Sequence, residues 1–324
     1  MKLSALTVAA MAAFALISAC ANDADDEANW KAAQAHLAQS LAASSSPRNW
    51  MLSSSLAAAP GSAEAAATLA KAATAAPDDV LVQWVAAVSG NEAATAALTR
   101  LQPDNAASWL PALRAAIGRR DETAIDDALT GFAAGTHVDD HYGQLLHAWQ
   151  DVLQRQPDAQ ICDGDEKHCV RAGRDFVLAV ALTAASVFPA VQPILAFCKA
   201  TAADSPRRRQ CEAGGRVMLE DGDTLVSSAV GFALLRGLGA LTPADEALRR
   251  QQEWLSDATM PVHRRLEPGT PEFAAFVADW TALDNEFEVM RRLAQRAGQP
   301  PLPPDGWVSP GQRAREAANA RGEP

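Results

Sequence analysis

Apolar residues recur at intervals of three and four along most of the chain from residue 30 onward. This spacing places apolar side chains on one face of an α-helix. Short clusters of serine, glycine, asparagine and proline interrupt the pattern, and such residues cap or end helices. The sequence therefore predicts an all-α protein with essentially no sheet. The expected helices cover residues 31–43, 50–59, 63–76, 92–101, 122–134, 137–157, 212–220, 225–238, 244–258 and 271–297.

Two segments of the N-terminal half are similar to each other. PDDVLVQWVAAV begins at Pro77 and PDNAASWLPAL begins at Pro103, and each is followed by a polar break and an alanine-rich helix. The region resembles degenerate tetratricopeptide repeats. Pro103 and Trp109 stand where that family places its terminal proline and first-helix tryptophan, and Asp121 and Ala124 fall near its inter-helix turn and small second-helix position. The interval between the two prolines is shorter than the usual repeat of about 34 residues.

The resemblance implies an array of stacked helical hairpins, similar to a solenoid, over residues 30–157. Such arrays present extended surfaces to other proteins, so the resemblance favours binding of a protein partner. Trp84 and Trp109 are the candidate partner contacts, because large aromatic side chains dominate protein interfaces. The alternative for both tryptophans is packing between hairpins.

The most apolar run after the N-terminal segment covers residues 176–197. A helix that is apolar all round is surrounded by other helices, so this run predicts the centre of a more compact bundle over residues 158–299. A membrane span is the alternative, and it needs about 20 uninterrupted apolar residues. Pro189 and Pro193 end the regular helix too early for that. We therefore expect a core helix.

Two pairs of cysteines flank this run, Cys162 with Cys169 and Cys198 with Cys211. In an exported protein four cysteines most simply form two disulfides, and four cysteines allow three connectivities. We expect the local pairs Cys162–Cys169 and Cys198–Cys211, because each spans a short polar turn. Zinc or calcium binding at residues 162–169 is the alternative, but neither a C-x-x-C pair nor a complete calcium loop is present there.

The N-terminal residues 1–19 have the layout of a secretory signal, with a lysine followed by an apolar stretch that is short for a membrane span. The sequence ISAC at residues 17–20 resembles the lipobox of bacterial lipoproteins. The resemblance implies cleavage before Cys20 and a lipid anchor on this residue. Because Ala21 rather than aspartate follows, it also implies an outer-membrane location facing the periplasm. Residues 20–29 are then a flexible tether; the alternative is an ordinary secretory signal with a chance cysteine.

The net charge of the chain limits the classes of partner that it can bind. The 324-residue chain has a formal net charge of −11, so it lacks the basic surface on which nucleic-acid binding depends. The dense basic cluster at residues 207–209 is expected to be a solvated helix start, with an anion site as the alternative. The proline-rich residues 300–324 are expected to form a disordered tail.

Motifs that carry catalysis are absent from the sequence. There is no G-x-S-x-G, H-E-x-x-H, P-loop or G-x-G-x-x-G motif. His137 and His141 would share one face of a helix and could chelate a metal ion, but no third ligand is visible close by, so we expect no metal site and no cofactor. Paired acids such as Glu286 and Glu288 are expected on solvated helix faces.

Two functions from different classes remain. The first is a non-enzymatic cell-envelope lipoprotein whose helices bind or scaffold another protein. The second is an envelope hydrolase whose essential acid cannot be identified from the sequence. A deep cleft that contains a partly buried aspartate or glutamate would favour the hydrolase.

Overall fold

The computed structural model describes residues 24–57, 62–155, 171–186, 189–263, 265–267, 269–313, 316 and 321. Over these residues the chain forms helices and no β-strand, apart from isolated bridges that join loops. The all-α prediction is confirmed. The expected signal peptide and Cys20 lie outside the described residues. The helices are α2 (Ala24–Ala42), α3 (Pro47–Ser55), α4 (Ala63–Ala75), α5 (Val80–Val88), α6 (Glu92–Leu101), η1 (Ala106–Trp109), α7 (Leu110–Arg119), α8 (Glu122–Ala134), α9 (Tyr142–Arg155), α10 (Arg171–Ser186), α11 (Gln192–Ala200), α12 (Pro206–Glu220), α13 (Leu225–Leu238), α14 (Pro243–His263), α15 (Pro271–Ala282) and α16 (Glu286–Arg296).

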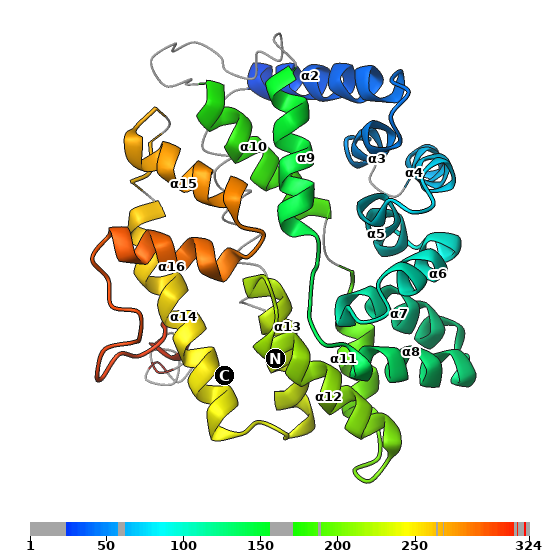
Figure 1. Cartoon of the computed structure of the whole chain (residues 1–324), viewed down its shortest axis with the longest axis vertical. Coiled ribbons are helices and arrows are strands. Elements are labelled where there is room, and N and C mark those ends of the chain that lie inside the picture. Colours follow the sequence, from blue (N-terminus) through cyan, green and yellow to red (C-terminus); the bar gives the residue numbers. More distant parts are fainter. Residues whose placement is uncertain are drawn as a thin grey trace.

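The N-terminal half is a stack of helical hairpins. α3 packs with α4, α5 with α6, and α7 with α8, and the hairpins follow one another along one side of the molecule (Figure 1). Polar N-caps explain where several of these helices begin. The side chains of Ser62, Asp79, Asn91 and Asp121 each accept a hydrogen bond from the backbone N–H three residues later. The prediction of stacked hairpins is confirmed.

The stack continues beyond α8, although α9 to α11 intervene in the sequence. α12 packs against α8, and α13 packs against α12 (Figure 1). Glycines allow α12 to lie close to α8 and α13 to lie close to α12. A Cβ at Gly214 of α12 would overlap the ring of Phe132 in α8, and a Cβ at Gly231 of α13 would overlap the backbone of α12. One hydrophobic core extends from Leu37 to Leu293, so the boundary expected after residue 157 does not divide the core.

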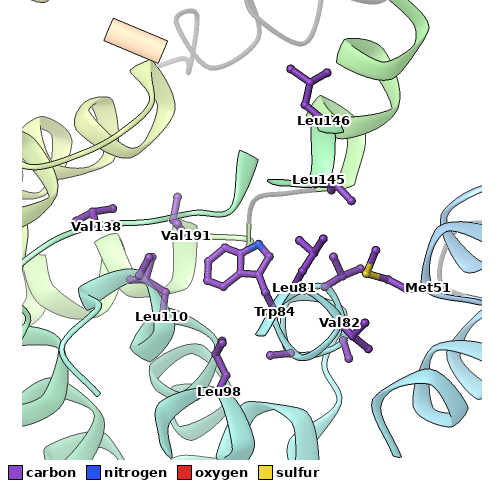
Figure 2. Close-up of a cluster of buried hydrophobic side chains, with 14 of the residues drawn as sticks. Met51, Leu81, Val82, Trp84, Leu98, Leu110, Val138, Leu145, Leu146 and Val191 are labelled. Carbon is purple, nitrogen blue, oxygen red and sulfur yellow. The ribbon is translucent and has the colours of Figure 1, made fainter. Parts of the chain in front are cut away.

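The side of the stack that faces α9 is filled by the chain itself. Trp84 of α5 lies there, and Leu145 and Leu146 at the start of α9 lie close to it, together with Val138 and Val191 (Figure 2). All five side chains are buried. Solenoids commonly bind partners on such an inner face, but here it belongs to the hydrophobic core.

The expected disulfide between Cys198 and Cys211 is confirmed. It links α11 to α12 across a Cα–Cα distance of 5.9 Å, and both side chains are buried in the core. The second expected pair, Cys162–Cys169, lies outside the described residues.

The apolar helix α10 packs beside α9. Its Phe176 makes edge-to-face contacts with Phe273 and Phe276 of α15. In the part of the chain that the structure describes, no helix combines the length and the apolar character needed to cross a membrane.

Several expected boundaries were wrong, three of them by an amount that changes the description of the fold. α2 begins at Ala24, inside the expected tether. The single helix expected over residues 271–297 is two helices, because Leu283 is extended and the Asn285 side chain caps α16. Residues 300–313, expected in a disordered tail, pack against α14 through Trp307.

Candidate functional site: the polar junction and its acidic pocket

Four loops from distant parts of the chain meet at one place, which we call the polar junction. Hydrogen bonds join the first loop to the second, the second to the third and the third to the fourth. The loops are residues 102–105 after α6, 137–141 before α9, 221–224 between α12 and α13, and 283–285 between α15 and α16.

Asn105 joins the first two loops. Its amide nitrogen donates to the backbone oxygen of Asp139 at 2.8 Å, and its amide oxygen accepts from the backbone N–H of Asp139 at 3.1 Å. Asn105 is completely buried, so these reciprocal bonds satisfy a side chain that would otherwise destabilise the core. The loop at 137–141 is thereby held against the hairpin stack.

Asp140 is the buried centre of the polar junction, with 1% of its surface exposed. One of its carboxylate oxygens accepts from the hydroxyls of Thr224 and Ser227, each at 2.6 Å. Its other oxygen accepts from the backbone N–H of Tyr142 at 3.2 Å. Burial raises the pKa of Asp140 above its ordinary value, and these hydrogen bonds act in the opposite direction. Asp140 therefore attaches α13 to the start of α9.

His141 is also completely buried and has a left-handed backbone with φ of 58°, a conformation that costs energy for a residue other than glycine. Its Nε2 lies 2.9 Å from the amide oxygen of Gln102, and its Nδ1 lies 3.3 Å from a carboxylate oxygen of Asp139. Its ring packs edge-on against Trp84 at 5.3 Å between centroids. Burial lowers the pKa of His141, which favours the neutral ring.

The metal site considered for His137 and His141 is not formed. α9 begins at Tyr142 rather than at His137, so the two histidines lie in a loop and do not share one helix face. Among the described residues no group of three or more histidine, cysteine, aspartate or glutamate side chains is arranged to hold a metal ion.

Asp223 and Glu286 are two partly buried acids on the far side of the polar junction. Asp223 accepts from the Asn285 amide at 2.9 Å, and Glu286 accepts from the backbone N–H of Leu225 at 2.7 Å. Burial raises the pKa of each carboxyl to about 7, and the nearby carboxylate of Asp140 adds to both shifts. Within the described chain neither acid forms an ion pair with lysine or arginine. Both therefore hold a proton for part of the time at neutral pH.

A pocket of about 370 Å³ opens beside the polar junction. Asp223 belongs to both, since it bonds to Asn285 and also lines the pocket. The walls come from the end of α12 and the turn after it, from α14, and from α16. His137, Asn285 and Pro301 add loop residues to these walls. The lining residues are His137, Glu220, Asp221, Gly222, Asp223, Leu248, Gln251, Gln252, Leu255, Asn285, Phe287, Arg291 and Pro301.

Neither tryptophan singled out from the sequence is a free surface residue. Trp84 has no exposed surface, so its candidate role as a partner contact was wrong: the start of α9 covers it. Trp109 is half-buried, its indole N–H donates to the backbone oxygen of Pro103 at 3.0 Å, and its ring lies against Gly131 of α8. Both tryptophans connect neighbouring parts of the fold.

Sequence reasoning missed the acids of this site. Glu286 was expected on a solvated face with Glu288, but the break before α16 turns it toward Leu225. Asp140 falls inside the helix expected over residues 137–157, and the acidic turn before α13 lies between the expected helices 212–220 and 225–238. The basic cluster at residues 207–209 is only partly solvated, because Arg207 pairs with Glu122 and Asp126 of α8. No local pattern shows which loops meet.

Comparison with known proteins gives no assignment. No family model, no curated protein and no solved structure matches the chain. The chemistry of the site must therefore be judged from its own residues.

The pocket combines two kinds of group. Asp223, Glu220 and Asp221 supply carboxylates, while Arg291, Gln251 and Asn285 supply hydrogen-bond donors. A volume of this size accommodates a side chain or a small polar ligand.

Proposed function

We propose that the protein is a cell-envelope lipoprotein, anchored by lipid at Cys20 in the outer membrane, that binds another envelope component without catalysing a reaction. In this proposal the helices form a rigid scaffold, and the contact site is the acidic pocket beside the polar junction. The ISAC sequence at residues 17–20 supports the anchor.

One observation carries the choice of site: a pocket lies where α12, α14 and α16 meet, and it contains the partly buried carboxylate of Asp223 without a lysine or arginine paired to it among the described residues. A ligand that brings a positive charge would supply the cationic partner that Asp223 lacks among the described residues. Ligands bind where a few polar groups converge in a concavity.

The rest of the described surface favours a polar contact over an apolar one. Leu302, with 57% of its surface exposed, is the exposed large apolar residue of the described chain. The inner face of the hairpin stack is closed by α9. These features favour recognition of a partner by hydrogen bonds and charge, and the pocket beside the polar junction is a concave site lined by such groups.

A second candidate function is the envelope hydrolase. The observation that favours it is again Asp223, whose pKa is raised to about 7 by burial. An acid with a pKa near the working pH is suited to general acid catalysis, and Asp223 lines a pocket as such a group must.

Photo-crosslinking in living cells tests the proposal. A photoreactive amino acid is placed at Gln251 in the pocket wall of the lipidated protein, and the crosslinked products are compared with those from the same amino acid at the exposed Arg100 of α6. We expect a discrete product from Gln251 that is lost when Asp223→Asn is added. Asp127→Asn, the same change at an exposed acid of α8, should leave the product unchanged.

An assay on isolated cell-wall material distinguishes the binding protein from the hydrolase. If the pocket only binds, the purified protein should release no soluble fragments from isolated cell-wall material, and Asp223→Asn should abolish crosslinking. Fragment release that stops in Asp223→Asn would establish the hydrolase instead. A Gln251 product that persists unchanged in Asp223→Asn would show that Asp223 does not make the contact.

A further inference from the structure

The segment that follows α16 lies against α14 as a strap, which we define as residues 299–313; it turns at residues 305–306, and residues 310–313 are helical. α16 ends in a left-handed glycine, Gly298, with φ of 68°, and the N–H of Gln299 returns to the backbone oxygen of Ala294 at 2.9 Å. The following sequence is PPLPPDGW, over residues 300–307. Its prolines have no N–H to donate and favour extended backbone, so this part of the strap is held by contacts with α14.

Two tryptophans make the main contact. Trp307 of the strap packs edge-on against Trp254 of α14, with 5.6 Å between ring centroids and 77° between ring planes. The indole N–H of Trp254 donates to the backbone oxygen of Pro300 at 3.0 Å. The indole N–H of Trp307 donates to the carboxylate of Asp257 at 3.0 Å. Each tryptophan thus uses its ring and its N–H to connect the strap to the helix.

Charged groups complete the attachment. The Arg250 guanidinium lies 5.4 Å from the centre of the Trp307 ring, a cation–π distance. Arg313, at the end of the strap, lies 3.4 Å from the same Asp257 carboxylate that accepts from Trp307. Asp257, Arg250 and Trp254 all belong to α14, so this one helix supplies a carboxylate, a guanidinium and an aromatic ring to the contact.

These contacts have the chemistry by which proteins recognise proline-rich ligands. The sequence PPLPP contains the P-x-x-P spacing twice, and segments of this kind bind aromatic surfaces in extended form with little entropy to lose. Leu302 of the strap is largely exposed, so aromatic and polar contacts, not this aliphatic side chain, attach the strap to α14. The attachment of the strap therefore resembles that of a bound proline-rich ligand, and it differs from the packing of one helix on another.

We propose that the α14 surface around Trp254 is a binding site for proline-rich, tryptophan-bearing segments. The chain's own strap occupies this site in the present structure, and a segment of the same kind on a partner protein binds there when the strap is released. The strap therefore acts as an internal competitor. Because Pro301 also lines the acidic pocket, release of the strap removes one wall of that pocket. The proposal does not depend on the function assigned to the pocket.

A synthetic peptide that copies residues 299–313 tests the idea directly. A fluorescent form of the peptide is titrated into the full-length mature protein in detergent, with wild type compared with Trp307→Ala, which loosens the internal strap. We expect Trp307→Ala to bind the peptide at least about tenfold more tightly than wild type, because the competitor is weakened. The peptide with its own tryptophan replaced by alanine should bind neither protein.

Three controls make the result decisive. Leu302→Ala changes an exposed strap residue and should bind the peptide as wild type does. Asp257→Ala removes the acceptor on α14, so it should loosen the strap but should not gain affinity for the peptide. Hydrogen exchange over residues 299–313 should show faster exchange in Trp307→Ala, with circular dichroism unchanged.

Several outcomes would overturn the proposal. The first is no peptide binding to Trp307→Ala although its strap exchanges faster. The second is a strap that stays as protected in Trp307→Ala as in wild type, since Trp307 would then not be its anchor. The third is a wild-type dimer that the peptide dissociates, which would make a second copy of this chain the occupant instead of a different partner.

Discussion

Individual carboxyl groups set the character of the polar junction. The carboxylate of Asp140 lies close enough to raise the pKa of both Asp223 and Glu286, and burial raises the pKa of all three. Hydroxyl and amide donors, not cations, satisfy these acids. Such a cluster is stable only if some of its members stay protonated.

The raised pKa values predict a specific pH dependence of stability. Asp223 and Glu286 have pKa values of about 7 in the folded protein and about 4 in an unfolded chain. The folded state therefore binds more protons between these values, and the free energy of unfolding should fall as the pH rises from about 4 to about 7 and level off above that. Denaturant titrations of wild type across this range measure the slope.

A matched pair of variants isolates the effect, because His263 acts in the opposite direction. Burial lowers the pKa of His263 to about 4, so its contribution is lost as the pH falls below about 6.5. Asp223→Asn should flatten the decline in the free energy of unfolding between about pH 4 and 7. Asp127→Asn, at an exposed acid, should retain the wild-type slope. Equal slopes in wild type and Asp223→Asn would contradict the assigned pKa.

Glycine substitutions test the packing of Trp109. A Cβ at Gly131 of α8 would lie 2.2 Å from the Trp109 ring, whereas a Cβ at Gly118 of α7 has no neighbouring atom within 4 Å. We expect Gly131→Ala to lower the free energy of unfolding by about 1–3 kcal/mol through overpacking. Gly118→Ala, in a helix with open space, should raise it by about 0.5–1 kcal/mol. If both variants have the same stability, Trp109 does not pack on α8 as described.

At the level of elements, most helices were predictable because their signals are local. The N-caps Asn91, Asp121 and Thr224 and the left-handed Gly239 lie within a few residues of the boundaries they set, so α6, α8 and α13 were placed correctly. The break before α16 was missed because the apolar stripe continues across Leu283. The polar junction was also missed, since its loops are brought together by tertiary packing that no single segment encodes.

The disulfide between α11 and α12 is expected to stabilise the fold without determining it. It closes a loop of 13 residues in sequence, and the loop-entropy model gives about 2–3 kcal/mol for such a loop. Replacing both Cys198 and Cys211 by alanine should lower the unfolding free energy by about this amount and leave the helix content unchanged. Non-reducing peptide mapping of wild type should recover the two cysteines in one crosslinked species. Free thiols at these positions would contradict the structure.

The molecule as a whole is a stack of helical hairpins whose inner face is covered by later parts of the same chain. α12 and α13 extend the row begun by α3, while α9 lies against its inner face and α10, α15 and α16 lie beyond α9 (Figure 1). This closure explains why the tryptophan of α5 is buried, and why the proposed contacts lie where the later helices meet. The acidic pocket and the strap on α14 share Pro301, so the two sites occupy one region of the surface.

The attachment of the molecule to a membrane is the last feature to test. The ISAC sequence at residues 17–20 predicts that lipid on Cys20 is the anchor, and a lipid anchor of this kind is lost with the residue that carries it. Cys20→Ser should therefore move the protein from the membrane fraction to the soluble envelope fraction, with its circular dichroism spectrum unchanged. Cys198→Ala serves as the control, because it removes a cysteine without touching the anchor. A Cys20→Ser protein that remains in the membrane after carbonate extraction would show that a protein segment, with residues 176–197 the first to examine, holds it there.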